Sequence, residues 1–349
     1  MKRGISMRSS MTLGSVALLA ALAACTANSA TGDDDGMGSG SDPGMGSGSD
    51  MDPEPPARGF QMKSPDVTIK AGQEITYCWY FKTPNTEAYT IKRWVSHMSS
   101  GSHHMIVFFT NSLSQPEGTV SSSSCGFGGG TNVGQWIYAA QNEDADLKLP
   151  ADDGAGKPVG MDVNPGQAGF IQMHYLNTSD DDITVHVTLN AEAYDAGVAT
   201  TKTFAYVTFN GNISIPPMST GTKATNTCNI PTTSKIWLMS THAHKQAVHT
   251  EVRDGSTATS PVVFASDDWE HPGACMTGAA NTGCPQAWAT NTFYTFASGK
   301  LTYECTYNNP TSNTIKTGDS AQTDEMCMAT GYYFPATKAT ICYNNFILP

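Results

Sequence analysis

The residues whose types and spacing most clearly suggest chemistry are His242 and His244, in the stretch Thr-His-Ala-His. A β-strand places alternate side chains on one face, so the two imidazoles would project together, roughly 6–7 Å apart along the strand. Two neutral imidazoles on one face can share a metal ion. The alternative is that both are ordinary surface histidines of a strand. Metal binding becomes the better interpretation because further candidate ligands occur elsewhere in the chain. These are His103, His104, His174 and Met326.

The adjacent pair His103-His104 cannot share one face of a regular strand, so both can bind one ion only at a bulge or a strand start. The preceding Ser-Gly-Ser, residues 100–102, permits such an irregularity. Met326, in Thr-Asp-Glu-Met-Cys, has a core methionine as its alternative. The remaining histidines match no ligand position, although one of them, His271, is a weaker candidate for a substrate pocket wall. They are His97, His186, His249 and His271.

The candidates must be carried by strands. Only 14% of the 349 residues are charged, 33 are glycine, and no long stretch has a helical period. Short segments rich in aromatic and β-branched residues alternate with Gly and Asn/Asp clusters. The sequence therefore predicts an all-β protein with two antiparallel, jelly-roll-like β-sandwich domains in tandem, at residues 59–205 and 206–349. The expected strands are Gln73–Phe81, Tyr89–Ser96, Met105–Thr110, Gly134–Ala140, Gly169–Leu176, Ile183–Asn190, Thr203–Phe209, Lys235–Ser240, Ala247–Arg253, Pro261–Phe264, Lys300–Tyr307 and Ala329–Phe334.

Residues 1–24 have the features of an export signal, with a basic start and a short apolar segment, Met11–Ala23. The end of this segment, Leu-Ala-Ala-Cys, resembles a bacterial lipobox and predicts a lipidated Cys25 after cleavage. The alternative is a plain secretory signal with an incidental cysteine. Thr26, in place of an aspartate, favours the outer membrane or the cell surface over inner-membrane retention. Residues 25–58, rich in Gly, Ser, Met and Asp, predict a disordered tether from that anchor.

Charge and cysteine content narrow the class further. The net charge of −12 argues against a nucleic-acid partner. Export implies an oxidising compartment, and eight cysteines remain after Cys25, which fits four disulfides. Two of the eight precede residue 200 and six follow it, although sequence alone leaves their connectivity open. They are Cys78, Cys125, Cys228, Cys275, Cys284, Cys305, Cys327 and Cys342.

Taken in order, the motifs resemble the copper type II, ascorbate-dependent monooxygenases, a family that includes peptidylglycine α-hydroxylating monooxygenase and dopamine β-monooxygenase. Each motif is short, but the ordered set is specific and runs from about residue 65 to the C-terminus. The stretches are His-His-Met-Ile-Val-Phe-Phe (103–109), Gln-Met-His-Tyr-Leu-Asn (172–177), Thr-His-Ala-His (241–244), Val-Arg-Asp-Gly (252–255), Cys-Thr-Tyr-Asn (305–308) and Thr-Asp-Glu-Met-Cys (323–327).

The resemblance implies two copper ions per chain. An electron-transfer copper would be held by His103, His104 and His174, and an O₂-activating copper by the catalytic residues His242, His244 and Met326. A solvent-filled gap between the domains would separate the two. A thioether favours Cu(I), which agrees with a methionine at the oxygen site, and zinc fits this ligand set poorly. The resemblance also implies three disulfides: Cys78–Cys125, Cys228–Cys342 and Cys305–Cys327. Cys275–Cys284 would then be an extra pair, closing a short loop.

The chain departs from the peptide-hydroxylating branch at positions that bind a substrate carboxylate. That branch has Arg two residues before the first ligand of the His-x-His pair, where this chain has Ser240. It has Asn and Tyr two and four residues after the Met ligand, where this chain has Met328 and Thr330. A peptide ending in glycine is therefore not the expected substrate. We expect a less polar, neutral substrate instead.

The implied reaction is hydroxylation of a C–H bond in a small organic substrate, using O₂ and an external one-electron reductant, either ascorbate or an equivalent not identified by the sequence. Two alternatives from other classes remain. One is a surface lipoprotein that buffers or delivers copper without turnover, and the other is an inactive scaffold used for adhesion. All six candidate ligands are present, which argues against the inactive scaffold. The sequence specifies neither the substrate nor the oligomeric state.

Overall fold

The computed structural model describes residues 51–123, 125, 134–278, 284–285, 288 and 293–348. The predicted signal peptide, Cys25 and most of the predicted tether lie outside these residues. The described part of the chain contains no α-helix, and it offers no helical segment of the length and apolarity that crossing a bilayer requires. The tether was expected to extend to residue 58, but Asp52 and Glu54 already form hydrogen bonds with residues of β12 (Val187–Ala193).

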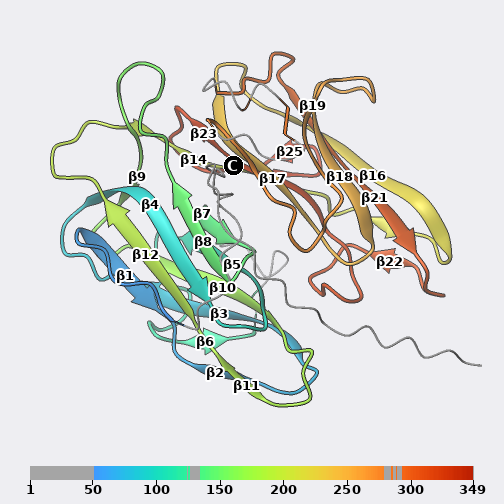
Figure 1. Ribbon diagram of the computed structural model, residues 1–349, viewed down its shortest axis with the longest axis horizontal. Coiled ribbons are helices and arrows are strands. Elements are labelled where there is room, and N and C mark those ends of the chain that lie inside the picture. The colour runs from blue at the N-terminus through green and yellow to red at the C-terminus, as the bar shows by residue number, and fades with distance from the viewer. Residues whose placement is uncertain are drawn as a thin grey trace, which may run out of the picture. The chain divides into compact units, whose positions relative to one another are not determined.

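Residues 59–202 form two larger sheets and one small one, drawn in blue to green in Figure 1. The first sheet has the order β1 (Gly59–Lys63), β12, β4 (Tyr89–Met98), β9 (Val159–Val163), β13 (Thr201–Lys202), with β8 (Asp144–Lys148) also paired to β4. The second has the order β6 (Val120–Ser121), β3 (Glu74–Lys82), β10 (Ala168–Leu176), β5 (Ser102–Phe109), β7 (Gln135–Ala140). The small sheet pairs β2 (Val67–Ile69) with β11 (Ile183–Val185).

Residues 204–347 repeat this plan, and no sheet of the described residues takes strands from both sides of Thr203. One sheet has the order β20 (Cys275–Met276), β17 (Lys235–Ala243), β23 (Cys327–Phe334), β14 (Phe204–Phe209), β24 (Thr340–Tyr343), β25 (Phe346–Ile347). The opposite sheet has the order β16 (Ser219–Asn229), β21 (Lys300–Asn309), β18 (Ala247–Asp254), β19 (Val262–Ser266). A small sheet pairs β15 (Ser214–Ile215) with β22 (Ile315–Lys316).

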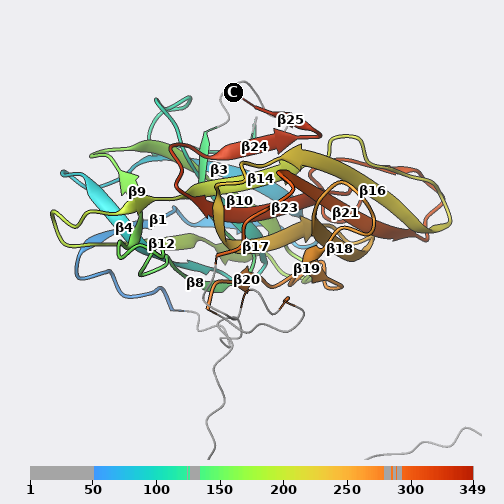
Figure 2. The same ribbon diagram turned by 90° about the horizontal axis from the view of Figure 1, so that it is seen from above.

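The predicted all-β fold with antiparallel sandwiches is confirmed, and its pairing is mostly antiparallel. Two short parallel pairs, β13 with β9 and β14 with β24, are additions that the sequence did not predict. Figure 2 shows β14, β23 and β17 side by side in one sheet of the C-terminal half. We use N-terminal half for residues 59–202 and C-terminal half for residues 204–347.

One apolar core crosses between the halves. Side chains of β23 and β17, including Trp237, Met328 and Tyr332, belong to the same buried cluster as the core of the N-terminal half. The Tyr332 hydroxyl donates to the backbone oxygen of Ile137 on β7, 3.2 Å away. A second core, around Tyr303 and Trp288, lies within the C-terminal half alone. The shared core therefore fixes one face of the β17–β23 sheet against the N-terminal half.

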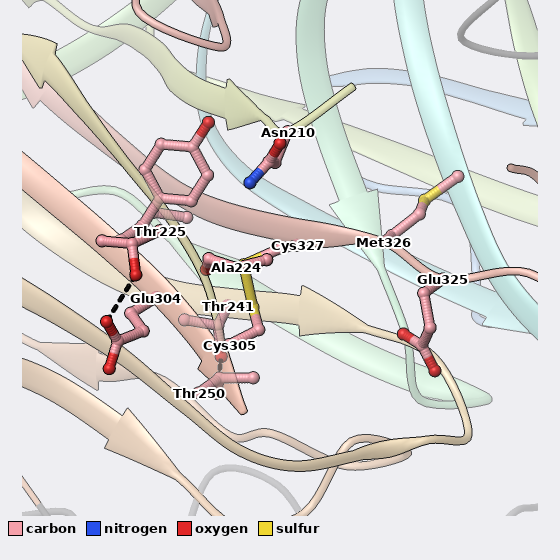
Figure 3. Close-up of a disulfide and its surroundings, with 12 residues drawn as sticks. Asn210, Ala224, Thr225, Thr241, Thr250, Glu304, Cys305, Glu325, Met326 and Cys327 are labelled. Atoms are coloured by element: carbon pink, nitrogen blue, oxygen red, sulfur yellow. Dashed lines mark hydrogen bonds between the residues drawn. A yellow bond between two sulfur atoms is a disulfide. The ribbon is translucent and has the colours of Figure 1, made fainter. Parts of the chain in front are cut away.

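The described residues include four disulfides, which are the three pairs that the family resemblance implies and the predicted extra pair. Of these, Cys305–Cys327 joins β21 to the first residue of β23, directly after Met326 (Figure 3). The sulfur-bearing residues of this pair are almost completely buried. The other pairs are Cys78–Cys125, Cys228–Cys342 and Cys275–Cys284.

In each half, a buried asparagine forms the same pattern of hydrogen bonds with backbone groups beside the small sheet. The side-chain amide of Asn177, just after β10, donates to the backbone oxygens of residues 69, 70 and 181, and its oxygen accepts the N–H of Ser179. Asn309, at the end of β21, donates to residues 215, 216 and 313 and accepts from the N–H of Thr311. Both sites use the full bonding capacity of an amide where a shorter side chain cannot reach.

We expect Asn177→Ala and Asn309→Ala each to lower the free energy of unfolding by about 1–3 kcal/mol, because each leaves several backbone groups without a partner. Urea denaturation followed by fluorescence measures both losses. The neighbouring exposed Thr178 provides the control, since Thr178→Ala should change stability by less than about 0.5 kcal/mol. Equal effects of Asn177→Ala and Thr178→Ala would contradict the assignment.

Candidate metal centre

Neighbouring strands of the N-terminal half carry the first three candidate ligands. His104 on β5 lies opposite His174 on β10, but the next paired residues are Tyr175 and Ser102, so His103 is an extra residue in β5. Gly101, just before, has a positive φ of 91°. The irregularity expected from Ser-Gly-Ser is therefore present as a bulge, and it lets two successive histidines approach the same point. Ligand atoms of His103, His104 and His174 lie within 4.8 Å of one another.

The other two histidines lie at the C-terminal end of β17. His242 is in the strand, and His244 follows its last residue, Ala243, which pairs with Cys327. The carboxylate of Glu325 accepts the backbone N–H groups of His244, at 3.0 Å, and Gln246, at 2.6 Å. These bonds hold the chain as it turns from β17 towards β18. Burial raises the pKa of Glu325 to about 8, although the backbone N–H bonds oppose this shift.

The five candidate histidines form one continuous cluster. The ring centroids of His103 and His242 are 5.8 Å apart, and those of His104 and His242 are 5.3 Å apart. His103 belongs to a second group whose ligand atoms lie within 4.8 Å of one another, together with His242 and His244. The resemblance implies two centres across a solvent-filled gap, whereas here the two groups adjoin and share His103.

Met326 lies at the same place through a different element. It precedes β23, its side chain is only 4% exposed, and it lines a cavity together with His104, His174 and His242. Figure 3 shows its side chain pointing to the opposite side of the backbone from the carboxylate of Glu325. Met326 also packs in the core shared by the halves. The structure thus places it on the wall of the cavity that three of the histidines also line, while its role as a ligand stays a prediction.

Several ring nitrogens in the cluster are buried without any hydrogen-bond partner in the described part of the chain. They are Nε2 of His103, Nδ1 of His104, Nε2 of His242 and Nε2 of His244. Leaving a buried polar atom unpaired costs about 1–3 kcal/mol, so four such atoms in one cluster call for a bound group. A metal ion satisfies them together, and neutral imidazole nitrogen is a ligand that copper prefers. The residues present therefore fit a copper site.

Other hydrogen bonds orient three of the rings. The Nδ1 atom of His242 contacts Oε1 of Gln141 at 3.2 Å, and Nδ1 of His244 contacts the backbone oxygen of Asp324 at 3.3 Å. Each of these contacts leaves Nε2 free for a metal. The Nε2 atom of His174 instead contacts Oε1 of Glu74 at 3.0 Å, which leaves Nδ1 on the opposite side of that ring.

Burial keeps four of the imidazoles neutral. Burial lowers the pKa of His103 to about 3 and that of His244 to about 4, and the neighbouring histidines add to both shifts. The pKa values of His104 and His242 are also held well below the usual range, again first by removal from water. Because a protonated imidazole cannot bind a metal, these four histidines stay competent for binding at weakly acidic pH.

A cavity of about 280 Å³ opens beside the cluster, between the two halves. Its walls are largely apolar, with Ile106, Trp136 and Leu238 among them, and the described lining residues include no lysine or arginine. Ser240 lies where the peptide-hydroxylating branch has its arginine, and its hydroxyl donates to the backbone oxygen of Gly273. Met328 and Thr330 line the same cavity. The described wall therefore offers no lysine or arginine side chain to bind a substrate carboxylate.

The other four histidines have carboxylate neighbours rather than a place in the cluster. His271 is exposed and is not part of the cavity wall, although the next two residues, Pro272 and Gly273, are. The pairs are His97 with Asp144, His186 with Asp52, His249 with Asp267 and His271 with Asp268.

Sequence reasoning missed two residues of the site, Glu74 and Gln141. Neither lies in a motif, and each reaches the histidines from a strand or loop distant in sequence. Gln141 also donates to the backbone oxygens of Trp269 and Glu270, so its carboxamide joins a loop of the C-terminal half to His242. A single sequence carries no local signal for such a contact.

The lowered pKa values predict how the metal-free protein responds to acid. A histidine that stays neutral when folded but is protonated when unfolded makes the protein less stable as pH falls below about 6.5. Replacing His103 by Asn should reduce the stability lost between pH 7 and pH 5 by about 2 kcal/mol. Urea denaturation of chelator-treated protein at both pH values measures the difference. An unchanged loss would mean that His103 is protonated in the folded state.

A family model described as "Copper type II ascorbate-dependent monooxygenase, C-terminal domain" matches residues 194–347. No curated protein matches the chain. Among solved structures, similarity is found to the major capsid protein P2 from bacteriophage PM2, at 7% identity over 78% of this chain and 97% of that chain, with a TM-score of 0.31. The VP2 subviral particle of infectious bursal disease virus is similar at 12% identity over 80% and 72% of the chains, with a TM-score of 0.17.

The likeness to the viral proteins is too low to support an argument. The family match is different, because it covers β17, β23 and the residues His242, His244 and Met326 at their ends. Residues 194–347 therefore match the C-terminal domain of the copper type II ascorbate-dependent monooxygenase family.

Proposed function

We propose that this protein is a dicopper monooxygenase that hydroxylates a C–H bond of a small, mostly apolar organic substrate, using O₂ and an external one-electron reductant of the ascorbate type. One observation carries the proposal: buried imidazole nitrogens without partners gather beside an apolar cavity, in a chain that carries this family's domain. His103, His104 and His174 would hold one copper ion, and His242, His244 and Met326 the other. When bound, copper supplies the one-electron and oxygen chemistry that these side chains lack.

The protein's own groups bind and orient in this scheme. The apolar wall of the cavity would take up the substrate and exclude water from the reacting carbon. Hydrogen bonds to the carboxamide oxygen of Gln141 and to the backbone oxygen of Asp324 fix the rings of His242 and His244. No lysine or arginine lines the described cavity wall, which favours a neutral substrate over a carboxylate.

We also propose that the protein is exported and held by a lipid on Cys25 at the outer membrane or the cell surface. This rests on the basic and apolar pattern of residues 1–24 and on the lipobox-like Leu-Ala-Ala-Cys. The Gly/Ser-rich segment that follows would keep the catalytic part clear of the membrane.

Copper stoichiometry and X-ray absorption on the reduced protein test the ligand set. We expect two copper ions per chain and a copper–sulfur signal that Met326→Ala removes. Met276, which lines the cavity wall but is not a candidate ligand, provides a matched control, because Met276→Ala should leave the sulfur signal in place. One ion per chain, or a sulfur signal that survives Met326→Ala, would contradict the assignment.

Turnover is tested by O₂ uptake in the presence of a reductant and a panel of small apolar substrates, with analysis of the hydroxylated product. His242→Ala should reduce product formation to background, because it removes a ligand of the oxygen site. The exposed His271 offers the control, and His271→Ala should retain activity. Copper binding without product formation for any substrate would support the buffering alternative instead.

A further inference from the structure

Glu74 is the residue that contacts both halves at the histidine cluster. It begins β3, and its carboxylate oxygen Oε1 lies 3.0 Å from Nε2 of His174. The same oxygen accepts the backbone N–H of Ala321 at 2.6 Å, and Oε2 accepts the hydroxyl of Ser320 at 2.7 Å. Ser320 and Ala321 belong to the C-terminal half, in the loop that leads to Met326.

The sheet register explains how Glu74 reaches His174. On β10, His174 lies opposite Thr76 of β3, so Glu74 is its diagonal neighbour on the same face. The side chain of Glu74 is only 18% exposed. An acceptor this buried is held in one geometry by the three donors around it.

The Ser320 loop continues the contact to the second group of ligands. The backbone N–H of Asp324 donates to the backbone oxygen of Ser320 at 3.0 Å, and the Ser320 hydroxyl accepts the N–H of Thr323 at 3.2 Å. The backbone oxygen of Asp324 is in turn the partner of Nδ1 of His244. One carboxylate is thus linked to His174 directly and to His244 through a short, hydrogen-bonded turn.

We propose that Glu74 is a positioning residue that couples the two metal groups, by orienting the ring of His174 and by anchoring the turn that orients His244. The copper part of this inference rests on the proposed function, but the orientation of the rings does not. Neither group then keeps its geometry unless the Ser320 loop is docked on the N-terminal half.

Glu74→Gln is the informative change because it keeps the size of the side chain. A carboxylate has two accepting oxygens, whereas the carboxamide has one and carries an N–H₂ group in place of the other. Because the N–H₂ group cannot accept, the contact that it faces is lost or, at the Ser320 hydroxyl, reversed, and the negative charge beside His174 is removed. Ser320→Ala removes the Glu74–Ser320 contact and the bonds that the hydroxyl accepts from the N–H groups of Gln322 and Thr323, and it leaves Glu74 its bonds to His174 and Ala321.

The first measurement needs no metal. Long-range ¹H–¹⁵N spectra of the histidine rings in the apoprotein report tautomer and environment. Glu74→Gln should shift the ring signals of both His174 and His244, while Ser320→Ala should shift mainly His244. Shifts confined to His174 in Glu74→Gln would overturn the coupling, as would unchanged signals in both variants.

The matched control is Gln135, another side chain of the N-terminal half that accepts a backbone N–H from the C-terminal half. Its Oε1 accepts the N–H of Ala339 at 2.6 Å, far in sequence from any candidate ligand. Gln135→Ala should leave the histidine signals unchanged. If it shifts them as Glu74→Gln does, the effect comes from loosened docking in general and the specific role of Glu74 is refuted.

The second measurement is copper affinity, by competition with a chromophoric chelator. Glu74→Gln should weaken binding to both groups by about 10- to 100-fold, the effect usual for loss of a partner behind a metal ligand. Gln135→Ala should keep wild-type affinity, and weakening of one group only would overturn the coupling. A wild-type protein that binds no copper would refute the proposed function instead, and the metal-free spectra would still decide the role of Glu74.

Discussion

The apolar contact between the β17–β23 sheet and the N-terminal half is the interaction on which the rest of the structure depends. Trp237, Met328 and Tyr332 are buried in one core with residues of β5, β7 and β10. Burying large aromatic side chains of this kind is worth several kcal/mol, far more than any single polar contact at the same boundary. The candidate ligands lie at or near the ends of the strands that make this contact. The packing therefore decides whether histidines from the two halves meet.

The histidine cluster destabilises the folded state, and the apolar packing between the halves offsets this. Four buried ring nitrogens without partners, held neutral in a partly dry environment, are unfavourable for folding alone. Polar atoms are seldom left in this state unless a ligand completes them. The bulge at His103, the turn held by Glu325 and the contact from Gln141 all preserve the unfavourable arrangement rather than relieve it. Function therefore explains these features better than stability does.

The fold class and much of the site could be predicted from sequence, for physical reasons. Strands such as β10 and β23 carry dense aromatic and β-branched residues, and the bulge at His103 follows from the glycine before it. By contrast, β16 was missed because it is an edge strand of mostly Thr, Asn and Lys with little buried surface. Glu74 and Gln141 were missed because their contacts join segments distant in sequence. The adjoining of the two histidine groups depends on how the halves pack, which local patterns do not encode.

The burial of the Cys305–Cys327 bridge has a consequence for the proposed use of an external reductant. Thiol–disulfide exchange requires a nucleophile to reach a sulfur atom in line with the bond. Both cysteines are at most 1% exposed, so small thiols from the surroundings cannot attack without local unfolding. The disulfide next to Met326 is thus protected from external thiols, so the proposed reaction would not need to trade its supply of reductant against the integrity of this cross-link.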